Sequence, residues 1–241
     1  MHKLFLFVGI AVLFNRAAFA ADGCEQGTFP VRSISGFDLS KPGNLEIAMD
    51  ALKLDEGDEL EFASSHESGH KTTKVRTCRE YDAAIEQRLL LMTGTQRTPE
   101  FLRECKVLRF LKKANAASSS CIEGYQLTKK SPDELPPSLG YVISGEQAEA
   151  VDKAEQVNWS WRKFSPELEF HVLSPTTLTA TGQGVVDKLE VMGFGDFNHD
   201  GIQDMLVWIS DYGGGTLVHY DAIVLTRKDK KSGFHTLARI E

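Results

Sequence analysis

The sequence predicts an α+β protein, with a helical, disulfide-linked N-terminal half and an antiparallel β module at its C-terminal end. Two observations predict this class. Apolar residues recur at helical spacing between residues 77 and 114, whereas from Trp159 onward short β-rich runs alternate with turns that contain glycine or aspartate. A third observation is the acidic segment GDFNHDGIQD at 195–204, which lies between two of the β-rich runs.

The first twenty residues have the character of a secretory signal peptide. Met1–Lys3 carries positive charge, Leu4–Phe14 is almost wholly apolar, and Ala18–Ala20 fits an A-x-A cleavage site. We therefore expect an exported protein, periplasmic or secreted, whose mature chain begins at Ala21. No later stretch is long and apolar enough to be expected to span a bilayer.

Charge and cysteine content narrow the function classes. The 241-residue chain has a formal net charge of −7, which argues against nucleic acid and anionic membrane surfaces as partners. Its four cysteines all follow the expected cleavage site. An even number of cysteines in an oxidising compartment predicts two disulfides.

Two helices are expected in an α-rich segment that covers residues 21–130. Thr77–Glu80 is a capping-box pattern, and helical periodicity continues to Met92 before Gly94. Thr98-Pro99 then offers an N-cap and a first-turn proline for a second helix that ends near residue 114. Together these helices predict an αα-hairpin.

The hairpin geometry constrains how the cysteines pair. Cys78 and Cys105 would be offset by about 12 Å along the helix axes at ~1.5 Å per residue, and a bridge needs Cα atoms within about 7 Å. A Cys78–Cys105 bridge is therefore disfavoured. We expect Cys78–Cys121 with Cys24–Cys105, and keep Cys24–Cys78 with Cys105–Cys121 as the alternative.

The second half is expected to begin after a linker. Residues 131–138 contain three prolines, which oppose regular structure. The β-rich module at 139–241 would open with a helix from the capping box at 144–147 to about residue 157. Trp159, Trp161 and Phe164 are interpreted as packing aromatics and not as a binding platform. The expected strands are 168–173, 186–192, 205–209, 217–226 and 234–240.

Oxygen donors fall at alternating positions in the acidic segment. Calcium takes six to eight oxygens at about 2.3–2.6 Å, and such alternation directs successive oxygens into one concavity. Gly201 permits the sharp turn, and without a cation the carboxylates would repel one another. The sequence therefore predicts a Ca²⁺ site whose ligands are the side chains of Asp196, Asn198, Asp200 and Asp204 and the backbone carbonyl of Ile202.

This loop differs from an EF-hand. An EF-hand would need glutamate at the twelfth position, where this chain has Val207 within an apolar run that predicts a strand. The segment resembles instead the D-x-[DN]-x-D-G-x-x-D loop of FG-GAP and related calcium-loop repeats, in which the loop joins two strands. Only one copy is present, so the resemblance implies a calcium staple in a single sheet and not a propeller blade.

The C-terminal third also looks like periplasmic immunity proteins and inhibitors of peptidoglycan hydrolases. The resemblance rests on the acidic loop, the following strand, the glycine turn, and the run Val218–Val224. It implies a non-enzymatic protein whose partner is another protein, a cell-wall hydrolase among the candidates. The loop expected to contact that partner consists of Tyr212, Gly213, Gly214, Gly215 and Thr216.

An enzymatic alternative comes from His66-Glu-Ser-Gly-His70, which matches the H-E-x-x-H pattern of zinc peptidases. In that pattern the two imidazoles bind zinc from one face of a helix and Glu67 acts as general base. The flanking residues are polar and Gly69 weakens a helix, so a polar loop is the favoured interpretation. Glu80 and Glu86 are the candidate third ligands, and no catalytic residue is otherwise assigned.

Overall fold

A computed structural model describes residues 23–29, 43–55, 58–64, 72–93, 98–142, 144–182, 184–213 and 217–240. At its centre lies a six-stranded antiparallel sheet with the order β11-β10-β9-β8-β7-β6, so each strand pairs with its neighbours in sequence. The strands are β6 (Glu169–Ser174), β7 (Thr177–Gly182), β8 (Val185–Gly195), β9 (Asp204–Gly213), β10 (Leu217–Thr226) and β11 (His235–Ile240).

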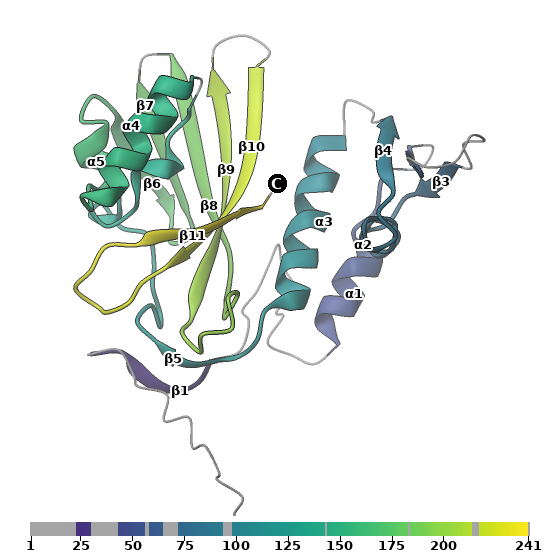
Figure 1. The fold of residues 1–241 in the computed structure, drawn as a ribbon, viewed down its shortest axis with the longest axis horizontal. Coiled ribbons are helices and arrows are strands. Elements are labelled where there is room, and N and C mark those ends of the chain that lie inside the picture. Colours follow the sequence, from purple (N-terminus) through teal and green to yellow (C-terminus); the bar gives the residue numbers. More distant parts are fainter. Residues whose placement is uncertain are drawn as a thin grey trace, which may run out of the picture.

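The alternation of side chains in β9 shows that both faces of this sheet are covered. Met205, Val207 and Ile209 belong to one apolar core. Leu206 and Trp208 point to the opposite face and belong to the other core. Figure 1 shows the sheet between α4 and α5 on one side and α3 on the other.

The N-terminal part covers one face. It contains α1 (Asn44–Ala51), α2 (Cys78–Glu86) and α3 (Thr98–Lys113), with a three-stranded sheet in the order β3-β2-β4. Its strands are β2 (Leu60–Ala63), β3 (Thr72–Val75) and β4 (Leu90–Thr93). On α3, Arg103 bonds to Glu190 of β8 at 2.8 Å and lies 5.1 Å from the ring centroid of Trp208. The α+β class is thus confirmed, but the N-terminal half is itself mixed and not purely helical.

Short helices cover the other face. They are the 3₁₀ helices η1 (Ser131–Asp133) and η2 (Pro137–Leu139), followed by α4 (Gly145–Gln156) and α5 (Trp161–Phe164). Leu135, Leu139 and Trp161 are fully buried in this core. Residues 131–138, expected to be a linker, therefore pack against the sheet, because the prolines start 3₁₀ turns whose apolar side chains point inward.

Helix α2 begins with the capping box that the sequence predicts, but it ends earlier than predicted. The Thr77 hydroxyl accepts a hydrogen bond from the Glu80 N–H, and the Glu80 carboxylate accepts one from the Thr77 N–H. The helix stops at Glu86 and not at Met92, because Arg88 adopts a left-handed backbone with φ of 57°. Residues 90–93 then pair with β2, so the simple αα-hairpin prediction is wrong.

This early end explains why the expected disulfide pairing is also wrong. The structure forms Cys78–Cys105, with Cα atoms 4.7 Å apart, and Cys24–Cys121, with Cα atoms 4.4 Å apart. The predicted axial offset assumed that α2 and α3 meet at a short turn. Since β4 lies between them, the N-terminus of α2 can contact the middle of α3. The second bridge joins β1 (Glu25–Phe29) to the end of β5 (Ala117–Ser120).

The α2 cap supports a prediction. Thr77→Ala removes the hydroxyl that accepts from Glu80 N at 3.2 Å, and we expect it to lower the free energy of unfolding by about 1 kcal/mol. Urea denaturation measures this change. Glu80→Gln is the matched control, because its amide oxygen can still accept the backbone N–H. An equal loss in both variants would contradict the capping explanation.

Candidate functional site

The acidic loop joins β8 to β9, as the sequence predicts. Gly195 and Asp204 pair across the two strands at its base. Gly201 has φ of 85°, and a Cβ atom on it would lie 2.9 Å from the Ser118 hydroxyl. A residue larger than glycine would therefore be strained there and would also press on its neighbour.

Hydrogen bonds inside the loop fold it around its own carboxylates. The two oxygens of Asp196 accept bonds from Asp200 N at 3.1 Å and Gly201 N at 2.9 Å. Asn198 Oδ1 also accepts from Asp200 N at 3.1 Å, and Asp200 Oδ1 accepts from Ile202 N at 2.7 Å. The expected ligands are thus held in one compact turn, with Asp196 buried and Asn198 and Asp200 exposed.

Asp204 is the most unusual member of the loop. It is fully buried, and its Oδ2 accepts a bond from Phe197 N at 3.1 Å. Its Oδ1 is also buried and has no hydrogen-bond partner among the described residues. The pKa of Asp204 is raised to about 7, chiefly by burial. Hydrogen bonds from Thr226 and Phe197 oppose this rise, and the charges of Asp200 and Asp196 add to it.

These residues fit a hard cation in their chemistry. Calcium prefers carboxylate, amide and carbonyl oxygens, and the five expected ligands supply those types. In the part of the chain that the structure describes, no group of three or more acidic, histidine or cysteine side chains forms a metal cluster. The buried Oδ1 of Asp204 has no hydrogen-bond partner among the described residues, so this atom is available to a cation.

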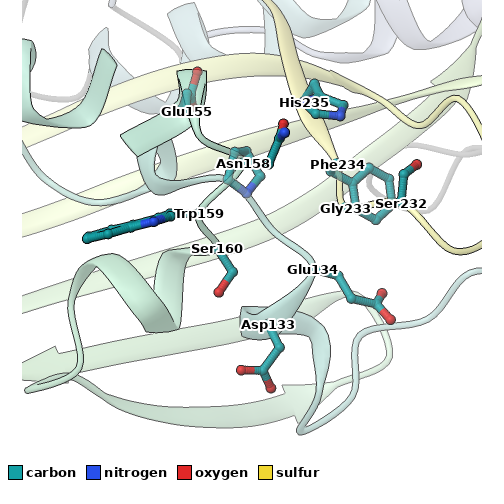
Figure 2. A pocket seen from close by; sticks show the side chains of 11 residues that line it. Asp133, Glu134, Glu155, Asn158, Trp159, Ser160, Ser232, Gly233, Phe234 and His235 are labelled. Atoms are coloured by element: carbon teal, nitrogen blue, oxygen red, sulfur yellow. The ribbon is translucent and has the colours of Figure 1, made fainter. Parts of the chain in front are cut away.

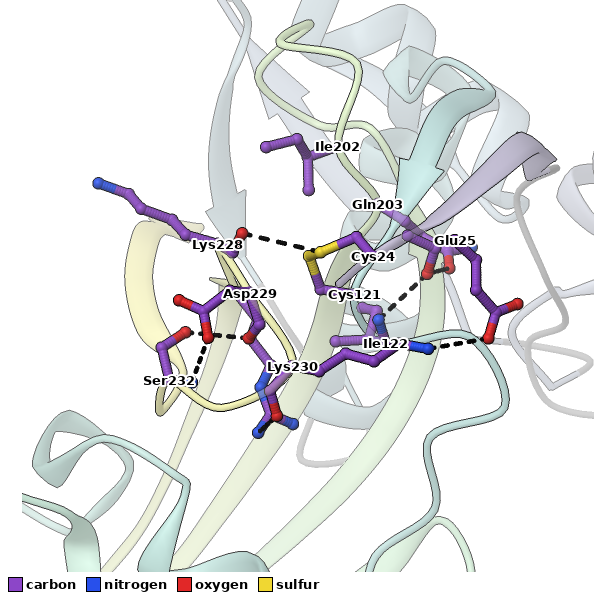
Figure 3. Close-up of a disulfide and its surroundings, with 12 residues drawn as sticks. Cys24, Glu25, Cys121, Ile122, Ile202, Gln203, Lys228, Asp229, Lys230 and Ser232 are labelled. Carbon is purple, nitrogen blue, oxygen red and sulfur yellow. Dashed lines mark hydrogen bonds and ion pairs between the residues drawn. A yellow bond between two sulfur atoms is a disulfide. The ribbon is translucent and has the colours of Figure 1, made fainter. Parts of the chain in front are cut away.

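The loop also fastens the N-terminal part to the central sheet. The Gly201 carbonyl accepts bonds from Ser118 N at 2.8 Å and Ser119 N at 3.0 Å, and Gln203 N donates to the Ser119 carbonyl at 2.9 Å. The Ser120 hydroxyl donates to Gln203 Oε1 at 2.7 Å. Figure 3 shows Ile202 and Gln203 close to the Cys24–Cys121 bridge.

A second acidic site lies on the face of the sheet that α4 and α5 cover. It is not among the sites that the sequence predicts. Asp187 of β8 is directly opposite Asp211 of β9, and Asp211 is opposite His219 of β10. Asp187 is 2% exposed and Asp211 is 4% exposed. Each has an Oδ1 with no hydrogen-bond partner among the described residues, whereas Asp211 Oδ2 lies 3.1 Å from His219 Nδ1.

This arrangement favours a shared proton. The pKa values of Asp187 and Asp211 are both raised to about 7, first by burial. The charge of Asp211 raises the pKa of Asp187 further, and Asp221 does the same for Asp211. A sequence signal did exist, because Asp187 and Asp211 occupy the same inward-facing positions as the core residues Leu189 and Ile209.

The structure describes the remaining predicted site residues in part. Tyr212 is 43% exposed and lies opposite Val186, which is 39% exposed, near the tip of the β9–β10 hairpin. Gly213 packs against Tyr141, whereas residues 214–216 lie outside the described residues. The same holds for His66, Glu67 and His70. Of their candidate third ligands, Glu80 is engaged in the α2 cap.

Trp159 and Trp161, interpreted together from sequence, occupy different environments. Trp161 is fully buried and packs edge-on against Phe170, with ring centroids 5.2 Å apart. Trp159 is 39% exposed. The packing interpretation is therefore confirmed for Trp161 but does not describe Trp159.

Comparison with known proteins identifies no relative: no family model, curated protein or solved structure matches the chain.

Proposed function

We propose that this chain is an exported, non-enzymatic protein that binds one Ca²⁺ in the 196–204 loop and acts by binding another protein. The observation that carries the calcium assignment is Asp204, which is fully buried with one carboxylate oxygen unpartnered. A cation would supply the missing partner and offset the repulsion from Asp196 and Asp200. The ligands would be Asp196, Asn198, Asp200, Asp204 and the Ile202 carbonyl.

The proposed role of the ion is structural. The loop hydrogen-bonds to β5, which leads directly to the Cys24–Cys121 disulfide, so a rigid loop would hold β1 and β5 against the sheet. An ion that binds only the folded state stabilises it by mass action. Two disulfides fit an exported protein. Among the described helices, none is long and apolar enough to cross a membrane.

Metal content tests the calcium assignment. Protein purified without chelators is expected to contain about one calcium per chain by mass spectrometry, and no zinc. After chelation, adding calcium at ~100 times its Kd should raise the free energy of unfolding by about 2.7 kcal/mol. Asp200→Ala and Asp204→Asn should abolish both results, whereas Glu149→Gln, on an exposed side chain of α4, should change neither. Absence of calcium and of any shift would overturn the assignment.

The protein-binding role is supported by the hairpin tip. Tyr212 and Val186 are large apolar side chains exposed on directly opposite residues of β9 and β8. Exposed aromatic residues of this kind are enriched at the centres of protein interfaces. We propose that this tip, with Gly213, Gly214, Gly215 and Thr216, contacts the partner, and that the partner is a cell-wall hydrolase.

Inhibition assays test this partner directly. The purified protein is expected to slow the clearing of peptidoglycan suspensions by at least one member of a panel of cell-wall hydrolases. Tyr212→Ser should weaken that inhibition by about tenfold or more, whereas Leu173→Ala, at an even more exposed apolar site on β6, should not. A panel without inhibition would reject the inhibitor role and leave the calcium result standing.

A further inference from the structure

A cavity of about 330 Å³ opens between the end of α4, the region around η1 and the segment that leads into β11. Figure 2 shows the side chains that line it, with Trp159 at one edge of the group and Asp133 and Glu134 at another. Its volume lies at the low end of the range of about 300–1,000 Å³ that is usual for ligand cavities. The cavity is distant in sequence from the acidic loop, and none of its lining residues belongs to the sites described above.

An exposed aromatic ring stands at this cavity. Trp159 is 39% exposed, and the ammonium of Lys163 lies 4.7 Å from its ring centroid. No other aromatic ring contacts Trp159 among the described residues. The exposed part of an indole that is held by a cation provides a rigid stacking surface.

The backbone beside this ring is unusual. Asn158 has φ of 53°, a left-handed conformation that few residues other than glycine adopt. This conformation ends α4 and directs residues 158–160 along the cavity. Asparagine in this conformation is a common way to end a helix, and here it fixes the direction in which residues 158–160 leave α4.

The charges in the lining are largely compensated. Asp133 is paired with Arg162 at 3.0 Å, and Glu134 with Arg227 at 3.5 Å. Glu155 Oε1 accepts bonds from Ser138 N at 3.3 Å and from the Thr236 hydroxyl at 3.2 Å. Because these acidic side chains already have partners, the cavity does not specifically select a cation. His235 is the one basic side chain among the described residues that line it, so a strongly anionic ligand is not favoured either.

Several neutral polar groups remain uncommitted. The Asn158 amide, the Trp159 indole N–H and the His235 imidazole have no side-chain hydrogen bond within the described residues. A wholly apolar ligand would leave such groups unpaired at a cost. The ligand that fits is therefore uncharged, with one apolar face for the indole and hydroxyl groups around its edge.

We propose that this cavity binds a neutral saccharide of one or two rings. The C–H face of a sugar ring would stack on Trp159, and its hydroxyl groups would exchange hydrogen bonds with Asn158 and His235. The unshared carboxylate oxygens of Asp133 and Glu134 would accept further hydroxyl donors at the lower edge of the cavity (Figure 2). This site is independent of the calcium loop and of the partner proposed for the hairpin tip.

Titration of the full chain with sugars tests the proposal. The probes are N-acetylglucosamine, its β-1,4-linked disaccharide, cellobiose and maltose, with binding followed by calorimetry and tryptophan fluorescence. At least one probe is expected to bind saturably. Trp159→Ala should weaken that binding by about tenfold, because the substitution removes both the ring stacking and the apolar area that the indole covers. Asn158→Gly, which relieves the backbone strain but removes the amide, should also weaken it.

Two controls separate binding from folding. Leu173→Ala changes an exposed apolar residue outside the cavity and should bind the sugar like the parent protein. Circular dichroism melts of all variants establish that each is folded at the titration temperature. The proposal is overturned if no probe binds saturably or if folded Trp159→Ala binds the sugar unchanged.

Discussion

Replacing Cys24 and Cys121 together with alanine is expected to lower the free energy of unfolding by about 4–5 kcal/mol. The bridge joins residues 97 positions apart, and a cross-link that closes so long a loop removes much conformational entropy from the unfolded chain. Domains are commonly stable by only about 5–15 kcal/mol. The variant should therefore be marginal at 37 °C.

The second disulfide is the matched comparison. Cys78–Cys105 spans only 27 positions, so its removal should cost about 3–4 kcal/mol by the same entropy relation. Urea denaturation of both double variants gives the two free energies. Hydrogen exchange should localise the first loss to β1, β5 and the 196–204 loop, and the second to α2 and α3. A larger loss from the shorter bridge would contradict the loop-entropy explanation.

Elements whose signal is local could be predicted from sequence. Thr77 and Ser144 both cap their helices as expected, since a capping pattern is read over four residues. The Thr98 start of α3 and the positions of β8, β9 and β10 were equally accessible. Strand β7, at 177–182, is not predicted from the sequence. Its threonine, glycine and small apolar residues give only a weak alternation of apolar and polar side chains.

Errors arose where distant contacts decide between local alternatives. Leu90–Thr93 fits the end of a helix as well as it fits a strand, and pairing with β2 selects the strand. The wrong disulfide prediction has the same cause, because the expected offset between Cys78 and Cys105 assumes a helix–helix turn that the chain does not make. The prolines of 131–138 were read as breakers, although their 3₁₀ turns bury Leu135 and Leu139.

The candidate sites divide in the same way. The acidic loop is contiguous, so its spacing predicts the glycine turn and the strand that follows, both of which the structure contains. The pair Asp187–Asp211 is separated by a hairpin and meets only through the register of β8 and β9. Its single sequence signal is the inward-facing position of both carboxyls, which becomes visible only after the strands and their buried face are known.

That pair leads to a second large effect, on the pH dependence of stability. The pKa values of Asp187 and Asp211 are about 7 in the folded protein, well above the ordinary aspartate value of ~3.9. Between these values the folded state holds more protons than the unfolded state. The contribution of this pair to the free energy of unfolding should therefore be greatest below about pH 4, and it should fall as the pH rises toward 7.

Asp211→Asn should remove about half of this dependence, because the burial that raises the pKa of Asp187 remains. The amide carries no charge and can donate a hydrogen bond to Asp187, whose own carboxylate then no longer faces a buried like charge. We expect the variant to be about 2–4 kcal/mol more stable than the parent at pH 8, at ~1.4 kcal/mol per unit of pKa shift, and nearly equal to it at pH 4.

Denaturant titrations from pH 4 to pH 8 measure the difference between the two proteins. Subtracting one curve from the other cancels the contribution of Asp204, whose raised pKa acts with the same sign in both. Asp152→Asn, at an exposed position on α4, should follow the parent curve. If Asp211→Asn also follows it, the two carboxyls do not share a proton, and the buried side chains must be neutralised separately. If the variant is instead less stable than the parent at pH 8, the Asp211 charge stabilises the fold at that pH. Its partner would then be the imidazolium of His219, whose Nδ1 lies 3.1 Å from Asp211 Oδ2.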